Sequence, residues 1–228
     1  MTPTAVVARL AVRELWMSFR LLVLLAAYLG AVALVTAVPA PSSTVLLRLA
    51  LALALAAVAG SSIAAWSLSH ERSLGRLGWL AARSVQRRTI LMGWFASLAL
   101  VTVAGVLGAG LLGWAALGGS AGRIGPTVFA LAMIASIGGA VALQALGLAV
   151  GSVLRPRLAS VVAGALSAIV ITGGWVVLPG LELPVEAIAH LQQLDRPISV
   201  ALQGTGGSLS LAVILLLAAA WALGRVDL

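Results

Sequence analysis

The sequence contains no cysteine and no lysine, and it has only six acidic residues. Without cysteine, the chain forms no disulfide, thiolate metal site or cysteine nucleophile. Without lysine, it cannot form the GxxxxGK[ST] loop with which P-loop enzymes hold nucleotide phosphates. The two histidines and the carboxylates show no metal-ligand spacing such as HExxH. We therefore expect no catalytic, cofactor or metal site in this chain and predict that it is not an enzyme.

Charge of either sign is scarce. Only 9% of the 228 residues are charged, 62% are hydrophobic, and the mean hydropathy is +1.15. An ordinary soluble domain carries about 25% charged residues, and a disordered chain is rich in charge and poor in apolar residues. These numbers predict an integral membrane protein.

Six charge-free runs are long enough to span a membrane, which takes about 20 mainly apolar residues in a helix. From these runs we expect an all-α protein with a single transmembrane domain over residues 1–228. The spans are expected near residues 21–38, 48–69, 90–117, 126–153, 158–178 and 207–223.

The arginines are unevenly divided between the two ends of these spans. The side that would hold both termini carries eleven arginines, and the other side carries Arg48, Arg123 and Arg196. Because cytoplasmic loops carry the excess of basic residues, we expect both termini in the cytoplasm and the chain in the plasma (inner) membrane as a multi-pass protein. The net charge of +8 is thus explained by topology, without nucleic acid. The eleven are Arg9, Arg13, Arg20, Arg72, Arg76, Arg83, Arg87, Arg88, Arg155, Arg157 and Arg225.

Residues 4–20 have the pattern of a helix lying in the membrane interface. At 100° per residue, Arg9, Arg13 and Arg20 fall within about 40° of one another, and Trp16 borders this stripe. Arginines would then face anionic headgroups, with the indole at headgroup level. The alternative is a plain basic flank of the first span.

The cytoplasmic segment 70–89 is far longer than a turn requires. It mixes basic residues with apolar ones, which a purely solvated loop does not need. This content favours docking on a partner protein or on lipid headgroups, although a solvated basic loop is the simpler interpretation. The residues expected to take part are Glu71, Arg72, Leu74, Arg76, Leu77 and Trp79.

The extracytoplasmic segment 179–206 carries a short amphipathic pattern that should end at Arg196-Pro197. Such a helix could cap the mouth of a pathway or lie at the interface. Within the spans, Gln144 either lines a pathway or forms an interhelical hydrogen bond, and Gly147 and Gly151 form a GxxxG packing pattern. No Asp, Glu or His lies in mid-membrane, which argues against an ion-coupled transporter.

Several segments resemble ABC-2 type transporter permeases. Residues 71–77 (ERSLGRL) and 84–91 (SVQRRTIL) resemble the family's loop between its second and third spans. Residues 183–198 look like its extracellular helices, and residues 224–228 (GRVDL) are similar to its basic-acidic terminus. Two departures stand in the loop, where Arg76 replaces a threonine and Gly78 replaces a glutamate.

The resemblance implies the membrane-spanning subunit of an ATP-driven exporter, in which residues from Glu71 to about Leu80 couple to the motor. The partners it implies are a separate ABC ATP-binding subunit, which would bind ATP and Mg²⁺, and a second permease copy or homologue, together with membrane lipid. An Ala/Leu/Val-rich pathway suits a lipidic, amphiphilic or otherwise hydrophobic substrate. Two alternatives stay open, a permease of the cytochrome c maturation type and a six-span scaffold or sensor that recruits partners through its basic loop.

Overall fold

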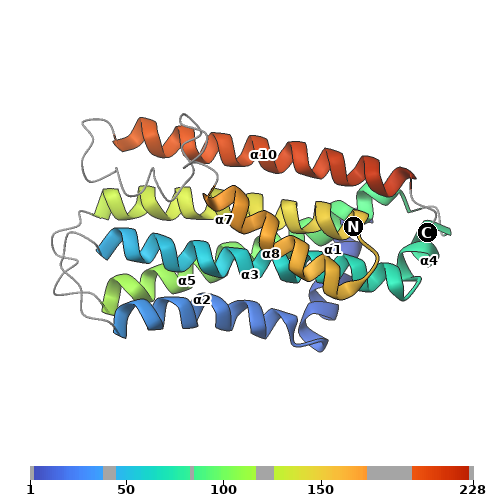
Figure 1. Cartoon of the computed structure of the whole chain (residues 1–228), viewed down its shortest axis with the longest axis horizontal. Helices are drawn as coiled ribbons and strands as arrows, with labels where there is room; N and C mark the ends of the chain where they lie inside the picture. Colours follow the sequence, from blue (N-terminus) through green and yellow to red (C-terminus); the bar gives the residue numbers. More distant parts are fainter. Residues whose placement is uncertain (1–2, 38–44, 83–84, 117–125, 174–196, 226–228) are drawn as a thin grey trace.

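The computed structural model describes residues 3–37, 45–82, 85–116, 126–173 and 197–225 (Figure 1). Within these ranges every regular element is a helix, which confirms the expected all-α class. The helices are α1 (Pro3–Met17), α2 (Arg20–Ala37), α3 (Val45–Ser73), α4 (Arg76–Ala82), α5 (Arg87–Ala116), α7 (Pro126–Val153), α8 (Arg157–Gly173) and α10 (Pro197–Arg225).

Four of these helices are long and apolar enough to cross a membrane. They are α3, α5, α7 and α10, and the pair α1–α2, which is bent by 73°, would be a fifth span if its two parts cross together. The apolar helix α8 is shorter, so six spans stay a prediction. The several long apolar helices nevertheless indicate a multi-pass membrane protein. In lipid no water is available to the backbone, and a helix makes its backbone hydrogen bonds within itself.

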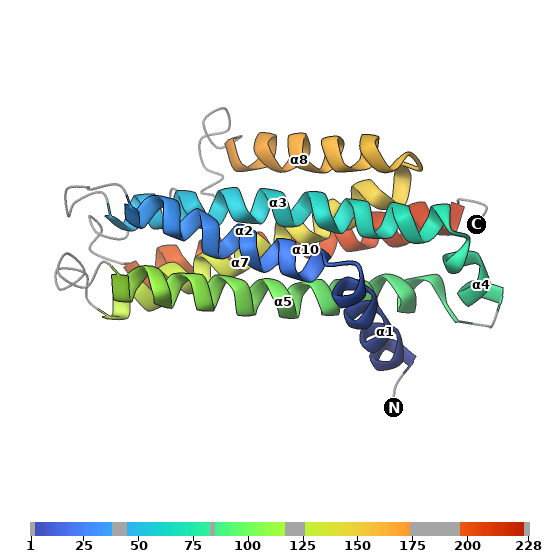
Figure 2. The ribbon, with the colours of Figure 1, turned by 90° about the horizontal axis from the view of Figure 1, so that it is seen from below.

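The long helices lie side by side and run alternately up and down the bundle (Figures 1 and 2). Helix α7 packs most extensively against α10 and α3, and α8 packs on α3 and α7. Helix α1 leaves the bundle axis and packs against α5, as Figure 2 shows.

Close contact between α3 and α7 depends on small residues. A Cβ atom at Gly147 would collide with the Ser61 carbonyl oxygen, and one at Gly151 would lie 2.5 Å from the Ala65 carbonyl oxygen. In lipid, where apolar burial gives no driving force between helices, such backbone approach is a main source of helix association. The GxxxG pattern therefore lies in the α3–α7 contact.

Two predicted boundaries were wrong. Helix α1 ends at Met17 and not at residue 20, because Phe19 has a φ of 58° and the chain bends before Arg20 begins α2. Helix α10 begins at Pro197, ten residues before the expected start, so residues 197–206 belong to this helix. Residues 174–178 of the fifth predicted span and residues 179–196 of the outer segment lie outside the described residues.

Basic residues gather at one end of the bundle. This end holds α1, α4, the link between α7 and α8 and the end of α10 (Figures 1 and 2). Of the arginines in the described ranges, only Arg48 belongs to the opposite end. The arginine-rich end carries Arg9, Arg13, Arg20, Arg72, Arg76, Arg87, Arg88, Arg155, Arg157 and Arg225.

Candidate functional site at the arginine-rich end

A tight turn carries the chain from α3 into α4. Gly75 has a φ of +69°, a left-handed conformation that glycine adopts without strain. Its amide donates to the Arg72 carbonyl at 3.0 Å, and its own carbonyl accepts from the Trp79 amide at 3.1 Å. The turn thereby lets the short helix α4 begin only three residues after α3 ends.

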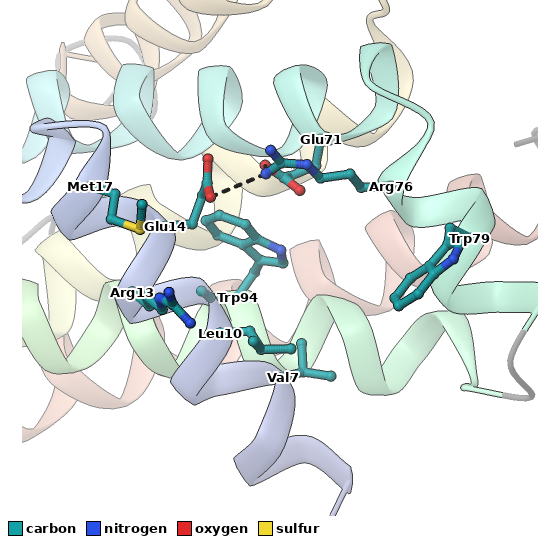
Figure 3. Close-up of a pocket in the computed structure, with 10 residues that line it drawn as sticks. Val7, Leu10, Arg13, Glu14, Met17, Glu71, Arg76, Trp79 and Trp94 are labelled. Carbon is teal, nitrogen blue, oxygen red and sulfur yellow. Dashed lines mark hydrogen bonds and ion pairs between the residues drawn. The ribbon is translucent and has the colours of Figure 1, made fainter.

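Arg76, the first residue of α4, links three helices through its guanidinium. Its Nη1 atom lies 3.1 Å from Glu14 Oε2 on α1 and 3.5 Å from Glu71 Oε1 on α3 (Figure 3). The side chains of Arg76, Glu14 and Glu71 are 50%, 27% and 7% exposed, respectively. Glu71 is the more buried of the two carboxylates, so the local dielectric around it is lower than around Glu14, whereas Arg76 itself is half exposed.

A second arginine lies beside this junction. Arg20 is buried, and its guanidinium carbon lies 4.6 Å from the centre of the Trp66 ring, a cation–π distance. Glu71 and Glu14 act on it electrostatically, but its Nε and Nη1 atoms have no hydrogen-bond partner among the described residues. Two arginines and two carboxylates thus lie together where α1, α2, α3 and α4 meet, and the ion pairs between them are those of Arg76.

Glu14 was missed by the sequence analysis, and Arg20 was placed wrongly. Arg20 does not share a headgroup-facing stripe with Arg9 and Arg13, because the bend after Met17 turns it into the bundle. Glu14 carried one available signal: it is the only acidic residue among the first 70. A single carboxylate in a basic, apolar segment is a reason to search for a buried partner.

Beneath the junction lies a cavity of about 420 Å³ between α1, the end of α3, α4 and α5. In Figure 3 the carboxylates and Arg76 lie on one side of it and Val7 and Leu10 on the other. Its wall is mostly apolar, with four charged side chains. The lining residues are Val7, Leu10, Ala11, Arg13, Glu14, Met17, Glu71, Arg76, Trp79 and Trp94.

The predicted coupling residues divide into an anchored set and an exposed set. Leu77 is 2% exposed and packs in a core cluster with Leu68 and Leu91. Leu74 and Trp79 are 46% and 56% exposed. The turn and α4 therefore present an apolar surface on one side and are held to the bundle on the other.

Arg72 has a different environment from its neighbours. Its Nη1 donates to the carbonyl oxygens of Gly151 and Ser152, at 3.3 and 2.5 Å, in the last turn of α7. Arg87, at the start of α5, likewise donates to the Leu223 and Gly224 carbonyls at the end of α10. Cations commonly satisfy the free carbonyls of helix C-termini in this way.

One face of α1 is packed and the other is open. Val7, Ala11 and Leu15 are buried, and the Ala8 carbonyl accepts a hydrogen bond of 2.8 Å from Ser97 on α5. The predicted interfacial residues Arg9, Arg13 and Trp16 are exposed. This arrangement is compatible with a helix that rests on the bundle and faces headgroups.

The polar residues of the bundle interior lie away from the cavity. Gln144 is fully buried, and its Nε2 donates to Thr102 Oγ1 at 2.9 Å. Its Oε1 atom and the Tyr28 hydroxyl have no hydrogen-bond partner among the described residues. Gln144 thus joins α7 to α5, and this placement fits the helix-packing interpretation.

Comparison with known proteins adds no family assignment. A scan against protein-family models and a search of curated proteins both found no match to this sequence. Within the described residues, no three His, Cys, Asp or Glu side chains are grouped to hold a metal ion. Fold and site therefore define a multi-pass helical membrane protein with a charged junction and an amphipathic cavity at its arginine-rich end.

Proposed function

We propose that this chain is the membrane-spanning permease subunit of an ATP-driven transporter of the ABC-2 type. The observation that carries the proposal is the segment formed by the turn after α3 and the short helix α4, which exposes Leu74 on the turn and Trp79 on α4. Exposed aromatic and apolar side chains at the end of a bundle are typical anchors for a partner protein. The partner would be a separate ABC ATP-binding subunit that binds ATP and Mg²⁺.

The anchoring of α4 supports a coupling role for this helix. Leu77 fixes α4 in the core, and Arg76 joins it to Glu14 and Glu71. A displacement of α4 by a moving partner would therefore pull on α1 and α3 together. Helix α3 packs along α7, and α7 packs against α10. A displacement of α3 would therefore be transmitted to α7 and through it to α10.

Glu71 has a supporting role in this proposal. With 7% exposure its side chain is turned toward Arg76 and is poorly placed to touch a partner directly. The surface that would meet the ATP-binding subunit is made by Leu74 and Trp79, and Glu71 holds that surface in position. Arg72, bonded to α7, is a further tie between the coupling segment and the bundle.

The remaining parts of the proposal follow from composition and resemblance. The arginine-rich end faces the cytoplasm of the plasma (inner) membrane, so α1 begins and α10 ends on that side. Six spans come from α2, α3, α5, α7, α8 and α10, and a second permease copy or homologue completes the pathway. Among the described residues the buried charged side chains, Arg20 and Glu71, lie at the arginine-rich end, and the apolar bundle beyond them suits export of a lipidic or amphiphilic substrate.

The test compares two exposed tryptophans of the same end of the bundle. Trp79→Ala removes the proposed anchor on α4, and Trp221→Ala removes a similarly exposed ring near the end of α10. With the cognate ATP-binding subunit in nanodiscs, we expect Trp79→Ala to reduce stimulated ATP turnover at least tenfold and Trp221→Ala to leave it unchanged. Equal turnover in both variants would contradict docking on α4.

A further inference from the structure

The cavity beside α1 has walls of two kinds. Val7, Leu10 and Trp94 supply apolar surface, and Arg13 adds a cation from the exposed side of α1. A volume of about 420 Å³ lies within the usual range of small-molecule sites. Such a site suits an amphiphile with an apolar part and a charged end.

The charges around the cavity favour an anionic end. Arg76 is paired with Glu14 and Glu71, and Arg20 interacts with the same carboxylates. Among the residues that the structure describes, no carboxylate pairs with Arg13. Arg13 is therefore the charged side chain of the cavity wall that has no ion-pair partner among the described residues, and the group that complements it is an anion.

The place of the cavity in the fold indicates which amphiphile reaches it. The cavity lies where α3 ends and α5 begins, at the level where the apolar spans give way to the arginine-rich end. Next to it, Trp16, Met17 and Phe19 are exposed on the bent segment, as expected of side chains that meet the membrane interface. A lipid of the surrounding leaflet would therefore have the shortest approach to the cavity.

We propose that this cavity is a binding site for an anionic phospholipid, with the phosphate group at Arg13 and apolar chain among Val7, Leu10 and Trp94. The site shares Arg76 and Trp79 with the segment proposed to dock the ATP-binding subunit, but lipid binding needs no such partner, so it is tested on the isolated chain. Because α1 and α4 both line it, a bound lipid would hold these two helices in their present arrangement.

The experiment titrates the purified full chain in detergent with phosphatidylglycerol and with phosphatidylcholine of the same acyl chains, and native mass spectrometry counts the bound lipids. Arg13→Gln removes the proposed phosphate partner. Arg9→Gln is the matched control, because Arg9 is exposed on the same helix and does not line the cavity. A third variant, Leu10→Trp, fills apolar space at a half-exposed position without changing charge.

We expect one phosphatidylglycerol molecule to bind more tightly than phosphatidylcholine. Arg13→Gln should weaken phosphatidylglycerol about fivefold, the effect of one basic residue near an anionic lipid, and Arg9→Gln should not. Leu10→Trp should reduce binding of both lipids. Three results would overturn the proposal. Equal effects of Arg9→Gln and Arg13→Gln would indicate binding to surface charge in general, and equal affinity for the two lipids would indicate a groove that binds only acyl chains. Full competition by glycerol phosphate would indicate a site for a free anion.

Discussion

The charged junction at α4 allows a quantitative test of how this short helix is held to the bundle. Glu71 and Glu14 contact the same Nη1 atom of Arg76, at 3.5 and 3.1 Å, but Glu71 is the more buried carboxylate, with 7% against 27% exposure. If distance decided, Glu14 would contribute more. If burial decides, Glu71 contributes more, because the local dielectric is lower around the more buried carboxylate.

The expected magnitudes lie between two known limits. Exposed ion pairs contribute about 0.2–1 kcal/mol, whereas removing one partner of a fully buried pair costs about 3–5 kcal/mol. Arg76 is half exposed, so we expect Glu71→Gln to cost about 2 kcal/mol and Glu14→Gln less than about 1 kcal/mol.

The assay is thermal unfolding of the purified chain in detergent. A cost of about 2 kcal/mol corresponds to a fall in Tm of about 4–8 °C for a chain of this size. Each substitution is repeated in an Arg76→Gln background, so that the coupling energy of each pair is separated from other effects. A fall in Tm for Glu14→Gln as large as that for Glu71→Gln would refute the reasoning from burial.

Three further substitutions and one matched control test the packing of the bundle. Gly147→Ala would press a methyl group on the Ser61 carbonyl, and we expect a loss of about 1–3 kcal/mol in thermal unfolding; Gly108→Ala, with nothing within 4 Å, should leave Tm unchanged. Gln144→Leu removes the bond to Thr102 and should cost about 0.6 kcal/mol; a large loss of transport with unchanged stability would instead place Gln144 in a pathway. Arg72→Ala should cost about 1–3 kcal/mol and speed amide hydrogen exchange in the last turn of α7, and unchanged exchange would show that its two carbonyl contacts are dispensable.

The helical class and most helix positions could be predicted from the sequence, because charge-free runs and spanning length are local properties. The start of α10 could not be predicted, since Pro197 was read as a stop. In the structure Pro197 is the first helical residue, where its fixed φ and missing amide donor are tolerated. The end of α1 was also missed, because a helical wheel continues through Phe19 without any sign of its positive φ.

The candidate site could be predicted only in part. The amphipathic content of residues 70–89 indicated a special segment, and the structure places a separate short helix there. The pairing of Arg76 with Glu14 joins residues 62 positions apart, so no local pattern could reveal it. The same holds for Arg72, which sequence analysis grouped with the coupling residues and which bonds to the end of α7.

The central claim is that α4 docks a separate ATP-binding subunit. Its most direct test is purification of the chain from its native membrane in mild detergent, with partners identified and counted by mass spectrometry, for the wild type and for Trp79→Ala. We predict a stoichiometric ATP-binding subunit with the wild type and its loss with Trp79→Ala. A preparation that holds other membrane or signalling proteins and no ATP-binding subunit would contradict the claim and favour a scaffold.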